Sequence, residues 1–299
     1  MRIVTFLFVL VVCSPILAAE PKVHRELSYA EPKNERQMLD VYAPTEGKNH
    51  PVVVWIHGGG WQTGDKKEVH NKPQAFTDKG FVFVSINYRL LPTVTIKQMA
   101  EDVAKAIRWV HDHAKDYGGD PNTLIVAGHS AGAQLAALVC TDERYLKAEK
   151  RSLRIVRNNG PGFLNWEDDG LPLSIIKACV PVDGDTYDVA MQIMTVEAKR
   201  AAIYRIKFGD EKMQKELSPV THVAKGKNIP PFLILHVADH PETRAQSQRL
   251  VKALQEAGIS AKAYSAEGKN HTTINNDLGL FGDRPTQEMF GFLSVVLKK

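Results

Sequence analysis

The stretch LIVAGHSAGAQLAALVC, residues 124–140, places a serine between two glycines where an apolar run ends and a run of small residues begins. The apolar run predicts a buried strand and the small-residue run predicts a helix, with Ser130 between Gly128 and Gly132 at the junction. A nucleophilic serine on a strained strand-to-helix turn needs small neighbours, and the turn leaves the next N–H at a helix N-terminus. We therefore predict that Ser130 is a nucleophile and that the Ala131 N–H helps to form an oxyanion hole, the alternative being a glycine-rich turn with an incidental serine.

A second glycine motif, HGGGW at residues 57–61, directly follows the apolar run PVVVWI. Three consecutive glycines lose much conformational entropy on folding, so their presence needs a reason. A flexible loop is the weaker explanation, because the segment follows an apolar run directly and ends at Trp61. A backbone that turns its N–H groups toward a reacting carbonyl oxygen explains the motif better. We predict that Gly59 and Gly60 are the other oxyanion donors.

A nucleophilic serine requires a histidine as general base and an acid that orients this base. In a sheet of this type the chain order is serine, acid and histidine, each after the carboxyl end of a strand. Asp239 ends the apolar run FLILHVAD, and His271 follows the next candidate strand. We predict His271 as the base and Asp239 as the acid, with Glu242 as the second choice. Three acids after the preceding strand would serve in a variant arrangement or line the hinge of an inserted segment: Asp183, Asp185 and Asp188.

Apolar runs alternate with helical patterns along the chain, which indicates an α/β layered sheet. Most of the runs are continuously apolar, as expected for strands of a mainly parallel sheet covered on both faces. We predict strands within residues 38–44, 51–61, 81–89, 123–130, 176–184, 230–239 and 260–268. Helices are predicted over residues 95–117, 241–257 and 285–298. Residues 185–228 are mostly polar and helical with no strand, which predicts an inserted cap.

The ends and the composition of the chain limit its environment and partners. Its 299 residues have a formal net charge of +4 and no long basic run, so no nucleic-acid surface is expected. Residues 1–19 have one basic residue, an apolar stretch and a small-residue end, which predicts a signal peptide cleaved near Ala19 and export to the periplasm or medium, an uncleaved anchor being the weaker interpretation. No later segment is apolar enough to span a membrane. Cys140 and Cys179 are expected as buried thiols, although export would permit a bridge between them.

No cofactor is expected. The histidines and acids lack the close paired spacing of a metal site, and no dinucleotide-binding glycine motif stands at a strand–helix junction.

Taken together, these segments resemble the α/β-hydrolase superfamily, and more narrowly its hormone-sensitive-lipase-like and feruloyl/acetyl-esterase-like carboxylesterases. The residues that show the resemblance are HGGGWQTGDK (57–66), NYRL (87–90), DYGGDPNTLIVAGHSAGAQLA (116–136), SPVTHV (218–223) and PPFLILHVAD (230–239). The resemblance implies one domain over residues 20–299, with a mostly parallel eight-stranded sheet, helices on both faces and a small helical cap at about 185–228. It also implies a triad of Ser130, Asp239 and His271, and an oxyanion hole from Gly59, Gly60 and Ala131.

Two segments depart from the family pattern. The sequence HPETRAQ after Asp239 is more polar than the small apolar and proline residues expected there. Residues 151–170 are longer and more irregular than expected between the nucleophile helix and the next strand, at a place that would shape the pocket.

Three functional hypotheses follow from these motifs. The first is an exported carboxylesterase that acts on short acyl or aryl esters, either small molecules or acetyl or feruloyl groups linked to a polysaccharide. The second is an amidase similar to arylformamidases, or a peptidase, on the same fold. The third is a non-catalytic binding domain, which the presence of Ser130, Asp239 and His271 together disfavours.

Overall fold

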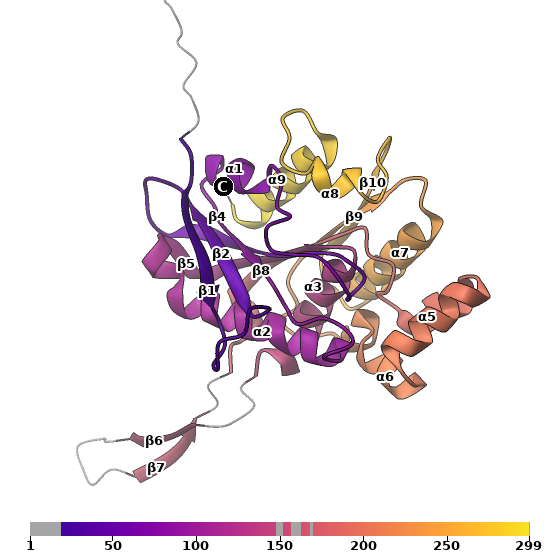
Figure 1. Cartoon of the computed structure of the whole chain (residues 1–299), viewed down its shortest axis with the longest axis horizontal. Helices are drawn as coiled ribbons and strands as arrows, with labels where there is room; N and C mark the ends of the chain where they lie inside the picture. The colour runs from indigo at the N-terminus through magenta and orange to yellow at the C-terminus, as the bar shows by residue number, and fades with distance from the viewer. Residues whose placement is uncertain (1–18, 148–151, 157–162, 168–169, 299) are drawn as a thin grey trace, which may run out of the picture.

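The structure is a computed structural model, and it describes residues 19–147, 152–156, 163–167 and 170–298. The predicted signal peptide lies almost entirely outside the described residues. Eight strands form one sheet in the order β1-β2-β4-β3-β5-β8-β9-β10 (Figure 1). Their bounds along the chain are β1 (Lys22–Ser28), β2 (Met38–Ala43), β3 (His50–Ile56), β4 (Val82–Ile86), β5 (Gly119–His129), β8 (Ile176–Val182), β9 (Phe232–Val237) and β10 (Ala261–Ala266). The prediction of an eight-stranded α/β-hydrolase sheet is confirmed.

The sheet is antiparallel only at one edge. β2 pairs antiparallel with β1 and with β4, and the remaining neighbours are parallel. The central parallel strands β3, β4 and β9 are buried almost throughout because helices cover both faces, as their apolar runs predicted, whereas the edge strand β10 is only partly buried. β1 was not predicted, since it is a mostly exposed edge strand of sequence KVHRELS without an apolar run.

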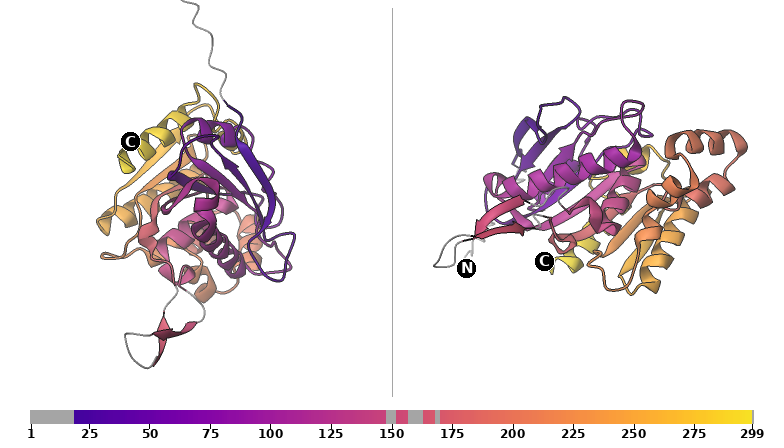
Figure 2. Two further views of the ribbon diagram at one scale, coloured as in Figure 1. Left: turned by 90° about the vertical axis from the view of Figure 1, so that its left-hand side faces the viewer. Right: turned by 90° about the horizontal axis from the view of Figure 1, so that it is seen from below.

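Helices lie on both faces of the sheet (Figure 2), and an apolar core fills the space on each face. The larger core packs the sheet against α2 (Ile96–His113), α3 (Ala131–Thr141) and α7 (Pro241–Glu256). The smaller core packs it against α1 (Lys72–Asp78) and α9 (Arg284–Val296). α2 continues into the short η1 (Ala114–Tyr117), so the helix predicted over residues 95–117 is present with a change of pitch at its end. Among the described residues, none of the helices has the length and apolar character needed to cross a bilayer.

The polar segment between β8 and β9 is helical in the structure. It contains α4 (Val189–Thr195), α5 (Ala198–Phe208), α6 (Glu211–Glu216) and η4 (Pro219–His222). α5 extends from the carboxyl edge of the sheet (Figure 1). It is joined to the HGGGW loop, because Lys207 Nζ donates a hydrogen bond to the Gly60 carbonyl at 2.9 Å and the ring centroids of Phe208 and Trp61 are 5.0 Å apart.

Three further features lie outside these layers. β6 (Ser152–Val156) and β7 (Phe163–Glu167) form an antiparallel hairpin that extends away from the main sheet (Figure 1). Short η2 (Glu143–Tyr145) and η3 (Leu173–Ile175) flank the segment that contains this hairpin. Cys140 and Cys179 are buried, free thiols in the larger core, as predicted.

Candidate active site

Ser130 occupies a strained turn between β5 and α3. Its φ is 55° and its ψ is −119°, a backbone conformation that residues other than glycine rarely adopt. A Cβ on Gly128 would lie 2.5 Å from the Gly132 carbonyl oxygen, and a Cβ on Gly132 would lie 2.2 Å from the carbonyl oxygen of Ile56 in β3. Both glycines are therefore required by close backbone approach, and the turn places the serine hydroxyl at the carboxyl edge of the sheet.

His271 lies between the serine and a carboxylate. Its Nε2 is 3.0 Å from Ser130 Oγ, and its Nδ1 is 2.6 Å from Asp183 Oδ2. Asp183 directly follows β8, its side chain is 0% exposed, and it also accepts a hydrogen bond from the Val237 N–H at 3.0 Å. Burial on its own would raise the pKa of Asp183, but His240, His271 and the Val237 N–H outweigh burial and hold this pKa well below its usual range. The carboxylate is therefore ionised and fixed toward His271.

The structure corrects the predicted acid. Asp239 lies exposed in the turn after β9, and among the described residues no hydrogen bond or ion pair joins it to His271. The second choice, Glu242, instead contacts Arg200 in α5. The physical reason is the turn after β8, where Asp183 adopts a φ of 49° and points its carboxylate toward His271.

The other two acids after β8 serve the inserted helices. Asp188 caps α4 by accepting a hydrogen bond from the Met191 N–H at 3.1 Å. Asp185 accepts a hydrogen bond from the Tyr204 hydroxyl in α5 and forms an ion pair with Arg200. The expected hinge acids thus divide into one partner of His271 and two anchors of the cap.

The HGGGW loop lies against the serine turn. A Cβ on Gly58 would lie 3.1 Å from the Cβ of Ser130. Gly59 and Gly60 have φ values of 108° and 59°, and a Cβ on Gly59 would meet the Thr63 carbonyl oxygen at 2.2 Å. Among the described residues, no protein acceptor takes the N–H of either glycine. Ala131 begins α3, so its N–H has no acceptor one turn earlier in the helix. The structure therefore places all three predicted oxyanion donors next to or within the loops around Ser130.

Two further histidines, one in each glycine motif, hold these loops. His129 Nε2 lies 2.9 Å from the His271 carbonyl oxygen, and burial lowers the pKa of His129 to about 3. His57 Nδ1 lies 2.7 Å from the Gly58 carbonyl oxygen, its ring stacks on Tyr88, and burial lowers its pKa to about 4. Both rings are therefore neutral at physiological pH and able to donate one hydrogen bond each to the backbone.

Ser130 and His271 line a cavity of about 480 Å³. Polar side chains from the loops after β3 and β10 form part of its wall, namely Glu68, His70, Thr272, Asn275 and Asn276. Gly59 and Gly60 also line it. A volume of this size is within the range of small-molecule sites, roughly 300–1,000 Å³.

A buried lysine supports the loop that contains His271. Lys72 is 0% exposed at the start of α1, and its Nζ donates a hydrogen bond to the Asn275 carbonyl at 2.7 Å in α8 (Thr273–Asn276). The same ammonium lies 4.7 Å from the ring centroid of Trp55, a cation–π contact. Burial lowers the pKa of Lys72 to about 7. Sequence analysis missed this residue because nothing in its neighbourhood along the chain marks it as buried.

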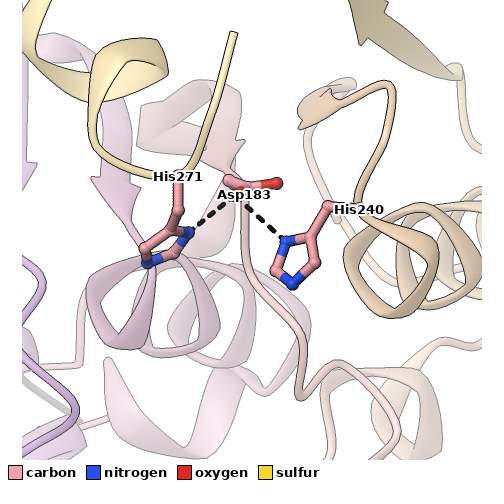
Figure 3. A group of neighbouring side chains, drawn as sticks. All are labelled: Asp183, His240 and His271. Carbon is pink, nitrogen blue, oxygen red and sulfur yellow. Dashed lines mark hydrogen bonds and ion pairs between the residues drawn. The ribbon is translucent and has the colours of Figure 1, made fainter.

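One group of side chains near the serine has the donors of a transition-metal site. Asp183, His240 and His271 each offer a ligand atom, and these atoms lie within 4.8 Å of one another (Figure 3). Sequence spacing could not reveal this group, because its members come from three separate loops. A metal ion bound there would have to compete with the hydrogen bond between His271 Nδ1 and Asp183 Oδ2.

The chain matches known proteins over most of its length. The family model BD-FAE matches residues 39–254. Esterase LipQ of Mycobacterium tuberculosis is 30% identical over 280 residues, which cover 89% of this chain and 61% of LipQ. Isoprenylcysteine alpha-carbonyl methylesterase ICME of Arabidopsis thaliana is 27% identical over 265 residues, which cover 85% of this chain and 57% of ICME. This chain thus spans about three fifths of the length of these relatives.

Solved structures show the same fold. Esterase B from Lactobacillus rhamnosis has a TM-score of 0.70 at 21% identity, with 93% of this chain and 88% of that chain covered. A truncated carbohydrate esterase from gut microbiota has a TM-score of 0.68 at 22% identity, with 94% of this chain and 98% of that chain covered. With its fold, its serine turn and the family match over residues 39–254, the chain belongs to the BD-FAE family of α/β-hydrolase proteins.

Proposed function

We propose that this chain is an exported serine hydrolase that cleaves carboxylic esters through an acyl-enzyme. Two consecutive hydrogen bonds support this most: Ser130 Oγ lies 3.0 Å from His271 Nε2, and His271 Nδ1 lies 2.6 Å from Asp183 Oδ2. This is the nucleophile, base and orienting acid that acyl transfer requires. The relatives' names point to the same reaction class.

In the proposed mechanism His271 removes the Ser130 proton, and Ser130 Oγ attacks the ester carbonyl. The N–H groups of Gly59, Gly60 and Ala131 stabilise the oxyanion. His271 then protonates the leaving alcohol, and water attacks the acyl-enzyme with His271 again as the base. Asp183 replaces Asp239 in this proposal, because it holds the His271 Nδ1 proton and stabilises the imidazolium.

The proposed substrates are short acyl or aryl esters. A cavity of about 480 Å³ has room for a small ester, and its polar wall of histidine, glutamate, threonine and asparagine side chains suits a hydroxyl-rich partner. Acetyl or feruloyl groups linked to a polysaccharide fit this description, and one solved structure with this fold is titled a carbohydrate esterase. The proposed export rests on residues 1–19 and is checked by N-terminal sequencing of protein secreted by a bacterial host, which should begin near Glu20.

The activity is tested with purified wild type and the Ser130→Ala variant. The substrates are p-nitrophenyl esters with acyl chains of about two to twelve carbons, methyl ferulate and N-formylkynurenine. Among the p-nitrophenyl esters we expect the enzyme to prefer short acyl chains. We expect ester turnover that depends on Ser130 and falls by about 10³ or more in the variant. Turnover confined to the formamide would replace this proposal with the amidase hypothesis. Equal, background rates for both proteins on all substrates would support a non-catalytic domain.

A further inference from the structure

Three successive carbonyls of the HGGGW loop have hydrogen-bond donors of different origin. The Gly59 carbonyl accepts the Thr63 N–H at 3.0 Å, and the Trp61 carbonyl accepts the Leu91 N–H at 2.9 Å. Both donors lie in loops that follow strands of the main sheet, β3 and β4. Among the described residues, the carbonyl between these two, that of Gly60, takes its hydrogen bond from the inserted helix α5. One peptide of the predicted oxyanion loop is thus held by the cap.

The donor is Lys207, in the last turn of α5. Its Nζ lies 2.9 Å from the Gly60 carbonyl oxygen and 5.4 Å from the ring centroid of Trp61, a cation–π contact. The side chain is partly buried, and this burial lowers the pKa of Lys207. The Asp185 carboxylate opposes that effect but is itself paired with Arg200. A partly desolvated ammonium is stabilised by the polar groups that it contacts, so the bond to the loop is favoured over a position in water.

α5 holds its place without the lysine (Figure 1). The ring centroid of Trp61 is 5.0 Å from that of Phe208 and 6.5 Å from that of Tyr204. The Tyr204 hydroxyl also donates a hydrogen bond to Asp185, in the turn after β8. The helix is therefore anchored both to the oxyanion loop and to the loop of the triad acid. Removal of the Lys207 ammonium should leave this anchoring intact.

The direction of the Gly60 N–H depends on the two peptides that flank this residue. In a trans peptide the N–H points away from the carbonyl of the preceding residue, and the Gly59 carbonyl is bound by Thr63. A glycine permits wide rotation of both peptides, so the second one must also be held. Lys207 holds it through the Gly60 carbonyl. Gly60 lines the cavity beside Ser130, and its N–H has no protein acceptor among the described residues.

We propose that Lys207 is a positioning residue of the oxyanion hole, which fixes the Gly60–Trp61 peptide so that the N–H groups of Gly59 and Gly60 remain directed at the substrate carbonyl oxygen. It acts through Gly60 and does not touch the reacting atoms. Negative charge on that oxygen develops in the transition state, so the contribution of Lys207 should appear in kcat more than in KM. The inserted cap thereby takes part in catalysis as well as covering the site.

Two substitutions at this position separate the ammonium from the rest of the side chain. Loss of one whole oxyanion donor costs roughly 10²–10³ in kcat. Lys207→Met keeps most of the apolar stem and loosens the donors rather than removing them, so we expect kcat to fall about 10- to 100-fold and KM to change less than about threefold. Lys207→Arg keeps a charged donor and should stay within about fivefold of wild type. The matched control is Lys199→Met, at an exposed position of the same helix, with kinetics near wild type.

The experiment measures kcat and KM for p-nitrophenyl acetate, together with inhibition by an aryl trifluoromethyl ketone and by the matching methyl ketone. Ser130 Oγ adds to the trifluoromethyl ketone carbonyl carbon, its proton passes to His271, and the carbonyl oxygen becomes an oxyanion in the hole. The methyl ketone binds without this adduct and reports ground-state affinity. We expect the inhibition constant of the trifluoromethyl ketone to rise in Lys207→Met by the factor by which kcat/KM falls, with that of the methyl ketone nearly unchanged.

Thermal melting shows whether the variants are folded, and Lys207→Leu replaces Lys207→Met with the same expected loss if the latter does not fold. The proposal is overturned if the folded variant keeps wild-type kcat. Equal weakening of both ketones would show a packing role only and would also overturn it, as would a loss in Lys207→Arg as large as that in Lys207→Met.

This inference rests on the proposed serine hydrolase, and the two fail separately. If Ser130→Ala retains wild-type turnover, the proposed function is wrong whatever the Lys207 variants show. If Ser130→Ala is inactive while Lys207→Met matches wild type in kcat and in both inhibition constants, the proposed function stands and only the role of Lys207 is wrong.

Discussion

Replacing Asp183 with Asn removes the carboxylate and is expected to reverse the tautomer of His271. The Val237 N–H donates to Oδ1, so the substituted amide keeps its oxygen there and turns its NH₂ toward His271 Nδ1. Nδ1 must then accept a hydrogen bond, which places the remaining ring proton on Nε2, the atom that faces Ser130 Oγ. His271 in this tautomer cannot take the serine proton.

The magnitude has two parts. Loss of the charge removes about 4 kcal/mol of attraction to the imidazolium for unit charges about 4 Å apart at an effective dielectric constant of about 20, or about 10³ in rate. The tautomer reversal brings the expected loss of kcat for Asp183→Asn to about 10⁴. Because the amide is nearly isosteric, melting temperature should change much less than activity.

The matched control is Asp239→Asn, a substitution at the exposed position that the sequence predicted as the acid. Steady-state kinetics on p-nitrophenyl acetate should show a change in kcat below about threefold for this variant, as for most exposed sites without partners. The reasoning is refuted if Asp239→Asn loses about 10² or more in kcat while Asp183→Asn stays near wild type.

Two further substitutions test the scaffold. Gly132→Ala should abolish activity and lower the melting temperature, because the new Cβ would lie 2.2 Å from the Ile56 backbone oxygen. Its control is Gly291→Ala in α9, which has open space around it and should raise the free energy of unfolding by about 0.5–1 kcal/mol. Equal melting temperatures for the two variants would contradict this prediction. Lys72→Met should change the pH dependence of stability. The pKa of Lys72 is about 7 in the folded chain and near its usual value of 10.5 when unfolded, so the unfolded wild type binds more protons between these pH values. Wild-type stability should therefore rise relative to the variant by up to about 1.4 kcal/mol per pH unit from pH 7 to 10 in urea unfolding, and a constant difference would argue against the depressed pKa.

The sequence predicted the features that are encoded locally. The serine turn is encoded by Gly128, Ser130 and Gly132, which lie within five residues of one another where an apolar run meets a helix. The strained backbone and the close packing of this turn can therefore be predicted from a short sequence motif. The same holds for the continuously apolar strands and for α2, which begins at the start of the helix predicted over residues 95–117. β1 escaped prediction because an exposed edge strand needs no apolar run.

The acid could not be chosen from sequence alone. Asp183 and Asp239 both follow buried strands, and β8 and β9 are neighbours in the sheet, so either turn ends close to His271. The choice depends on the φ of 49° at Asp183 and on the Val237 N–H that fixes its carboxylate. Such long-range contacts leave no spacing pattern, and the same is true of the contact between Lys207 and Gly60.

The central claim is that Ser130 is the nucleophile of a Ser130–His271–Asp183 triad, and covalent labelling tests it most directly. Wild type is incubated with a fluorophosphonate, digested, and analysed by mass spectrometry of the peptides. The account predicts one phosphonylated site, Ser130, with no label in Ser130→Ala and labelling slowed by about 10³ or more in Asp183→Asn but not in Asp239→Asn. Label on another residue, or ester hydrolysis that persists at the wild-type rate in Ser130→Ala, would contradict it.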